Sequence, residues 1–347
     1  MKLLTKSLAL IPALLFTASC TDAGTESSGE SSTESSADPS VETVMSGLNN
    51  PSSVAFSPDG KLTVTDANGV VYLGDGKGGK EAYLSGFPSQ HWKSDDSGKK
   101  WYQVGPLSAL WHDDWLAVTN AGLGDGQETV LFFDGPGKVA DGEATNSVGP
   151  TTSDPADMGE GNLTGLSVTP DGKHLFLGGQ GYDEKTWVLK VDVASRKLSA
   201  AFSADDHGIT TNSPMDTLTT DRGTVLVLYS GAGSKVDGLV VEWDIKSGKP
   251  SNQWRIPELV NPMGFAHLGG NRYAMVENNW DLKQVNSGRV AIVTLGDEKT
   301  AEVKPTGVTL MGPVACTVGP DGRLYVTQLG SEFDSDNGSV VAIKGIQ

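Results

Sequence analysis

The sequence predicts an all-β chain folded as a six-bladed β-propeller with four-stranded blades. A unit of strand, tight turn and strand recurs six times along residues 44–347, at a spacing of roughly 50 residues, as expected for one blade per repeat. Glycine is abundant, at 44 of 347 residues, which suits a chain rich in tight turns. No helix longer than one turn is indicated by the apolar pattern. We therefore expect sheets arranged around a central axis.

The clearest copies of the repeat carry a Pro-Asp-Gly turn between two apolar strands. They lie at 53–64, 166–177 and 315–326. Proline presets the backbone angle at the start of such a turn, and glycine accepts the left-handed conformation near its end. Degenerate copies turn at 112–114, 221–223 and 269–271. Together the six turns define six units.

Each unit continues with a third apolar strand, and most continue with a fourth. The third strands are expected at 70–73, 129–133, 187–191, 238–243, 289–294 and 339–343, and fourth strands at 82–85, 198–202 and 253–256. The last unit ends near Ile343 without a fourth strand, whereas a spare strand is expected at 42–46, before the first unit. We predict that this N-terminal strand completes the last blade, because ring closure hides the open edges of the first and last sheets.

The segment from Asn50 to Gly60, followed by Val64, Thr65 and Asp66, resembles the NHL and SMP-30/gluconolactonase class of six-bladed propellers. The resemblance covers nearly all of 44–345. It implies the fold but not one function, because propellers of this class include binding proteins, scaffolds and hydrolases.

In this class, the loops between the second and third strands and the loops between blades lie on one face. The long connections in this sequence are 86–102, 120–128, 135–161, 178–185, 203–213, 230–237, 278–287 and 330–338. Long loops on a rigid frame concentrate binding residues, and these carry the candidate ligand-binding residues Tyr182, Asp183, Trp280 and Asp281. Exposed aromatic rings beside carboxylates suit a sugar, a cation or a partner protein. The alternative is that the rings cap the loops and the acids keep the surface soluble.

A second set of candidates comes from aligning the ends of the second strands. The six positions are Asp66, Asn120, Gly179, Tyr229, Glu277 and Gln328. Asp66, Asn120 and Glu277 are the further candidates for ligand binding at the mouth of the central channel. In the resembling propellers an Asp at this position often has a structural role, in which it accepts backbone N–H bonds from the adjoining loop.

The enzyme alternative is a metal-dependent hydrolase that acts on lactones or related esters at the channel mouth. The resembling lactonases bind a divalent cation such as calcium through a Glu, an Asn and an Asp, and the matched positions here are Asn49, Thr164 and Met215. All three differ from the family pattern. Asp216 is the sole carboxylate at the start of an inner strand and is therefore the candidate metal ligand. Binding without catalysis remains the main prediction.

The N-terminus predicts export. Lys2 and Lys6 precede an apolar run at 8–16, and small residues then lead to Cys20, which is the layout of a secretory signal. The residues before Cys20 resemble the lipobox of bacterial lipoproteins, although Thr17 stands where that family usually has Leu. The resemblance implies cleavage before Cys20 and lipidation of its sulfur. The alternative is an ordinary signal peptide with an incidental cysteine.

Residues 20–43 are rich in Ser and acids, and we predict that they form a disordered tether. The formal net charge is −17; loss of residues 1–19 removes two Lys and no acid, which leaves 24 basic and 43 acidic residues and a charge of −19. Such a field disfavours nucleic acid. We expect a monomer in the cell envelope, anchored to either the inner or the outer membrane by lipid alone. Its expected partner is a small molecule, a carbohydrate or an envelope protein.

Overall fold

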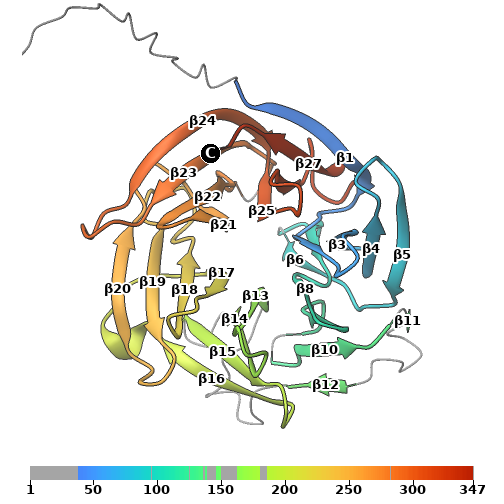
Figure 1. The fold of residues 1–347 in the computed structure, drawn as a ribbon. Coiled ribbons are helices and arrows are strands. Elements are labelled where there is room, and N and C mark those ends of the chain that lie inside the picture. Colours follow the sequence, from blue (N-terminus) through green and yellow to red (C-terminus); the bar gives the residue numbers. More distant parts are fainter. Residues whose placement is uncertain are drawn as a thin grey trace, which may run out of the picture. The chain divides into compact units, whose positions relative to one another are not determined.

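The structure is a computed structural model, which describes residues 38–94, 96–124, 126–135, 137–138, 146–149, 162–179, 186–281 and 283–346. Six of its sheets follow one another around a ring (Figure 1). A single 3-10 turn, Asp205–His207, is the only helical element with bounds in the described part of the chain. Within the described residues no helix has the length and apolar character needed to cross a bilayer. The predicted six-bladed propeller is confirmed.

The blades follow the chain in order, and their strands run from the centre outward. Blade 1 contains β2 (Ser53–Phe56), β3 (Leu62–Asp66), β4 (Val70–Gly74) and β5 (Lys80–Ser85), and β11 (Gly137–Lys138) adds a parallel edge strand. Blade 2 contains β8 (Ala109–His112), β9 (Trp115–Asn120), β10 (Thr129–Phe133) and β12 (Asn146–Val148). Blade 3 contains β13 (Thr164–Val168), β14 (His174–Gly179), β15 (Trp187–Asp192) and β16 (Lys197–Ser203).

The second half of the ring repeats the same order of strands. Blade 4 contains β17 (Pro214–Thr219), β18 (Thr224–Tyr229), β19 (Leu239–Asp244) and β20 (Pro250–Arg255). Blade 5 contains β21 (Pro262–Gly269), β22 (Arg272–Glu277), β23 (Ser287–Thr294) and β24 (Glu302–Met311). Blade 6 contains β25 (Pro313–Val318), β26 (Leu324–Gln328), β27 (Gly338–Lys344) and the N-terminal β1 (Ser40–Leu48).

The N-terminal strand closes the ring, as predicted. β1 pairs antiparallel with β27 along its length and forms the outer edge of blade 6, so the two ends of the propeller share one sheet (Figure 1). Val44, Met45 and Leu48 are fully buried in the apolar cluster between blades 6 and 1. The strand begins at Ser40, upstream of the predicted propeller boundary at residue 44. Closure therefore rests on both backbone pairing and side-chain burial.

The Pro-Asp-Gly turns owe their shape to side-chain capping. In the blade 3 turn, the Asp171 carboxylate accepts hydrogen bonds from the Thr169 hydroxyl at 2.7 Å and from the Lys173 amide at 3.2 Å. The glycine that follows, Gly172, has the left-handed φ of 69°. Short polar side chains that bond their own backbone favour such turns over longer loops. These turns hold each inner strand against its second strand.

One hairpin was not predicted from the sequence. The connection expected as a loop at 86–102 contains two paired strands, β6 (Gln90–Ser94) and β7 (Lys100–Val104). They form a separate two-stranded sheet between blades 1 and 2. The pairs His91 with Gln103 and Lys93 with Trp101 set its register. This hairpin supplies aromatic side chains to the site described below.

Candidate functional site

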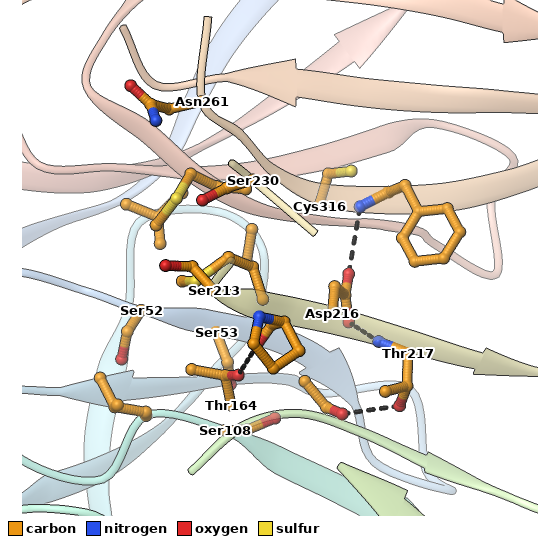
Figure 2. Close-up of a pocket in the computed structure, with 18 of the residues that line it drawn as sticks. Ser52, Ser53, Ser108, Thr164, Ser213, Asp216, Thr217, Ser230, Asn261 and Cys316 are labelled. Carbon is orange, nitrogen blue, oxygen red and sulfur yellow. Dashed lines mark hydrogen bonds between the residues drawn. The ribbon is translucent and has the colours of Figure 1, made fainter. Parts of the chain in front are cut away.

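A cavity of about 1150 Å³ runs along the axis of the propeller and is lined by all six inner strands. Its wall is dominated by apolar residues and by neutral hydroxyl and amide groups, some of which are drawn in Figure 2. The polar members labelled there include Ser52, Ser53, Ser108, Thr164, Ser213, Ser230 and Asn261. Inner strands of a propeller converge on the axis, so each blade contributes side chains to the same space.

Asp216 supplies the one carboxylate that the inner strands contribute to the described cavity wall. Its Oδ1 accepts a hydrogen bond from the Thr217 amide at 2.9 Å, and its Oδ2 accepts one from the Phe265 amide at 3.1 Å (Figure 2). Burial raises the pKa of Asp216 to about 7, although the two backbone N–H groups favour the ionised form. The carboxyl group therefore exchanges its proton near neutral pH.

The mouth of the cavity carries a cluster of four aromatic rings, Trp92, Tyr102, Trp280 and Phe333, which we call the mouth cluster. The Tyr102 ring lies 4.8 Å from Trp280 and 4.9 Å from Phe333 between ring centroids, and the Trp92 ring lies 5.5 Å from Trp280. These are the edge-on and tilted separations at which aromatic pairs attract each other. Trp92, Tyr102 and Trp280 also line the cavity. The β6–β7 hairpin thus meets loops of blades 5 and 6.

Hydrogen bonds fix the base of the hairpin against blade 6. The Asp334 Oδ1 accepts bonds from the Gln103 amide at 2.6 Å and from the Asn50 side chain at 2.9 Å. Asn50 also donates to the Gln103 carbonyl at 3.0 Å. Tyr102 and Asp334 both have left-handed backbones, with φ of 59° and 56°, which non-glycine residues adopt only where the surroundings hold them. This network positions the Tyr102 ring in the mouth cluster.

Sequence reasoning assigned no site role to Tyr102 or Gln103. A usable signal was present, because residues 90–94 and 100–104 are rich in aromatic and alternating residues and flank a Ser97-Gly98 turn. That pattern predicts a hairpin. It does not predict which distant loops the hairpin meets.

The structure places two of the predicted loop residues at the cavity. Trp280 and Asp281 both line its mouth, and Trp280 belongs to the mouth cluster. The predicted residues Tyr182 and Asp183 lie outside the described residues, as does Cys20.

The residues predicted at the ends of the second strands do end those strands, but they lie behind the cavity wall. Asp66 is buried and accepts hydrogen bonds from the Asn49 amide at 2.9 Å and the Asn68 amide at 2.8 Å. Glu277 is buried, accepts a bond from the Val260 amide at 2.7 Å and pairs with Arg289 at 2.6 Å.

Asn120 is also buried, and its side chain lies 3.4 Å from the Thr129 hydroxyl. The contacts of Asp66 and Glu277 match the loop-holding role described as the structural alternative, since both accept backbone N–H groups from the segment that leads into an inner strand. Ligand binding by these three residues stays a prediction.

The residues present do not fit the metal that the resemblance implies. The Thr164 hydroxyl donates to the Pro214 carbonyl at 2.7 Å, and Met215 offers a thioether. Asn49, whose buried side-chain oxygen has no hydrogen-bond partner, does not line the cavity that holds Asp216. Asp216 remains the only carboxylate in the set. Among the described residues, no three His, Cys, Asp or Glu side chains group together. Calcium takes about six to eight oxygen ligands, so we derive no step through a metal.

Comparison with solved structures found extensive similarity in fold. Similar chains include a gluconolactonase from Xanthomonas campestris, with 13% identity and a TM-score of 0.58 over 87% of this chain and 89% of that one. They also include a glucose dehydrogenase described as a putative oxidoreductase from Thermus thermophilus, with 14% identity and a TM-score of 0.55 over 88% of this chain and 99% of that one. The chain shares their propeller fold.

A luciferin-regenerating enzyme is similar over 89% of this chain and 96% of its own, with 14% identity and a TM-score of 0.56. No protein-family model and no curated protein matched the chain. The predicted SMP-30-like propeller fold is thus confirmed by structure. At such low identity the likeness concerns the fold and not the activity.

Proposed function

We propose that this propeller binds a small, polar organic molecule, of which a carbohydrate is the leading class, inside its central cavity. The observation that carries the proposal is the cavity of about 1150 Å³ with neutral hydroxyl and amide groups along its wall and four aromatic rings at its mouth. Ligand sites in proteins are concave, largely apolar and furnished with a few polar groups that fix orientation. Hydroxyl groups match a polyhydroxylated ligand, and aromatic rings stack on its apolar faces.

The names of two similar structures are consistent with a ligand of this size. A gluconolactonase and a glucose dehydrogenase act on molecules of the size of one sugar ring, and this chain has their fold. A partner protein on the long-loop face is the other class considered above. The cavity favours the small molecule, because a protein partner would leave its deep wall unused.

Replacing Trp280 with Ala is expected to weaken binding of the best sugar or polyol by about tenfold, or about 1.4 kcal/mol, because the ligand loses a stacking surface at the mouth. Isothermal titration calorimetry of the full-length chain with neutral sugars and polyols, sorbitol included, measures the effect. Tyr83→Ala is the matched control, since Tyr83 lies on the outer strand β5 against Trp111 and away from the cavity. Equal losses in both variants, or no binding by any compound, would contradict the proposal.

The alternative of a metal-dependent hydrolase has a direct test. The full-length chain is incubated with lactones and with calcium or zinc. We expect no metal-dependent turnover, because Asp216 is the only carboxylate among the residues at or next to the positions of the lactonase metal ligands. Turnover that disappears in Asp216→Ala, while Asp244→Ala on β19 away from the cavity retains it, would replace binding with catalysis as the function.

We further propose that the protein is exported and held at a membrane of the cell envelope by lipid on Cys20. The proposal rests on the sequence pattern of residues 2–20. Cys20→Ser should move the protein from the membrane to the soluble fraction after cell fractionation. Cys316→Ser is the matched control, because Cys316 is buried in the propeller. Membrane association that survives Cys20→Ser would refute lipid anchoring.

A further inference from the structure

The inner strand of each blade has one position, beside the cavity, from which a side chain can hydrogen-bond the next blade. Counted from the turn in each blade, these positions are Ser53, Ser108, Gly165, Asp216, Gly264 and Ala315. At three of them a side-chain oxygen accepts a backbone N–H from the next blade. Ser53 accepts from Ala109 at 3.1 Å, Ser108 accepts from Leu166 at 3.0 Å, and Asp216 accepts from Phe265 at 3.1 Å. The position thus ties neighbouring blades together.

At Ser53 and Ser108 a neutral hydroxyl oxygen is enough to accept the hydrogen bond from the next blade. The fold therefore does not require a carboxyl group at position 216. The additional oxygen of Asp216 bonds only the amide of the next residue, Thr217, and each carboxylate oxygen has a second lone pair. Asp216 also lines the cavity and is partly exposed to it. Holding this acid there is unfavourable, since burial raises its pKa to about 7. A carboxylate that is retained despite the free-energy cost of burying its charge is a candidate for ligand recognition.

The charges around the cavity favour a positive ligand. Lys283 is the one Lys or Arg among the described lining residues, and it lies exposed at the mouth. The Asp216 carboxylate therefore has no cationic partner along the described wall. The formal charge of −17 draws cations toward the protein as a whole.

We infer that the ligand is an organic ammonium ion with hydroxyl groups, whose charged nitrogen pairs with the Asp216 carboxylate while its hydroxyls bond the neutral wall. This inference rests on the proposed function and specifies its ligand class. An ammonium group has three donors and no acceptor, which suits a carboxylate with unused lone pairs in a cavity whose wall carries hydroxyl oxygens.

The test compares two probes that differ in one group: glucamine (1-amino-1-deoxyglucitol) and sorbitol, in which a hydroxyl replaces the ammonium. We expect the full-length chain to bind glucamine at least tenfold more tightly than sorbitol in calorimetry at pH 8. Asp216→Ser should remove that preference and leave the sorbitol affinity within about threefold. The serine keeps the tie to Phe265, as Ser53 and Ser108 do in their blades, so the variant should fold. Its melting temperature checks this.

The pH dependence gives a second readout. A carboxyl group with a pKa of about 7 is about one-tenth ionised at pH 6 and about nine-tenths ionised at pH 8, so glucamine affinity should rise about tenfold over this range. An alkylamine stays protonated throughout. Other titratable groups on the strands around β17 are His174, Tyr229, His267 and Cys316. Asp216→Ser should flatten the profile; a slope that survives would come from a histidine and would contradict the inference.

The outcomes separate this inference from the proposed function. If sorbitol and neutral sugars bind as tightly as glucamine, the cavity is a ligand site but the ammonium inference is wrong. If the preference for glucamine persists in Asp216→Ser, another group selects the cation and the inference is also wrong. If no sugar, polyol or amine binds, both proposals fail.

Discussion

Val44→Asp is expected to remove a large part of the stability of the propeller. Val44 is fully buried on β1, in the cluster that joins blade 6 to blade 1. An ionised carboxylate there would have no partner, and the strand that closes the ring would leave its place rather than bury it. We expect a loss of at least about 4 kcal/mol in the free energy of unfolding, against a typical total of about 5–15 kcal/mol.

Chemical denaturation followed by tryptophan fluorescence measures this loss. Val41→Asp is the matched control on the same strand, since Val41 is 48% exposed and should change stability by less than about 0.5 kcal/mol. A similar small effect in both variants would mean that β1 is dispensable and that the ring is held without its N-terminal strand.

Gly165→Ala is expected to destabilise the chain by about 3 kcal/mol or more. Gly165 has a left-handed φ of 52°, and a Cβ atom there would lie 2.4 Å from the Asp216 Cα and 2.9 Å from its Oδ1. The left-handed backbone costs a non-glycine residue about 1–2 kcal/mol, and overpacking adds about 1–3 kcal/mol. Because the obstructing atoms include backbone, the two inner strands must separate. The substitution should therefore also disturb Asp216.

Gly60→Ala separates these two causes. Gly60 also has a left-handed φ, of 81°, but no atom lies within 4 Å of the position that an alanine Cβ would take, so only the backbone cost of about 1–2 kcal/mol applies. Thermal unfolding of both variants gives the comparison. Equal destabilisation would show that blades 3 and 4 do not approach each other closely at Gly165.

Most of the fold was predictable because it depends on local patterns. The Pro-Asp-Gly turns set the repeat, and the apolar runs placed the third strands within a few residues of β4, β10, β15, β19, β23 and β27. The closing strand was predictable too. The last unit has only three expected strands, and one additional strand is expected near Glu42, before the first unit. Turn chemistry and strand periodicity act over a few residues, so a single sequence reveals them.

The candidate site was only partly predictable. Trp280 and Asp281 could be found because they lie in a long loop, where binding residues concentrate. Tyr102 and Phe333 meet only because the β6–β7 hairpin reaches loops far away in sequence. The resemblance to lactonases makes Asp216 a candidate metal ligand, but its relation to Ser53 and Ser108 emerges only from hydrogen bonds between blades. The alternation of apolar and polar residues within one blade does not predict contacts between residues of different blades.

The sequence by itself determined the number of blades, the order of their strands and the closure by the N-terminal strand, because each depends on short-range patterns repeated along the chain. Only the tertiary structure decided which side chains face the axis together, which carboxylates serve as loop anchors and which one faces the cavity. The physical reason is that burial and convergence on the axis arise from all six blades at once. The charge and solvation of Asp216 are properties of that assembled ring.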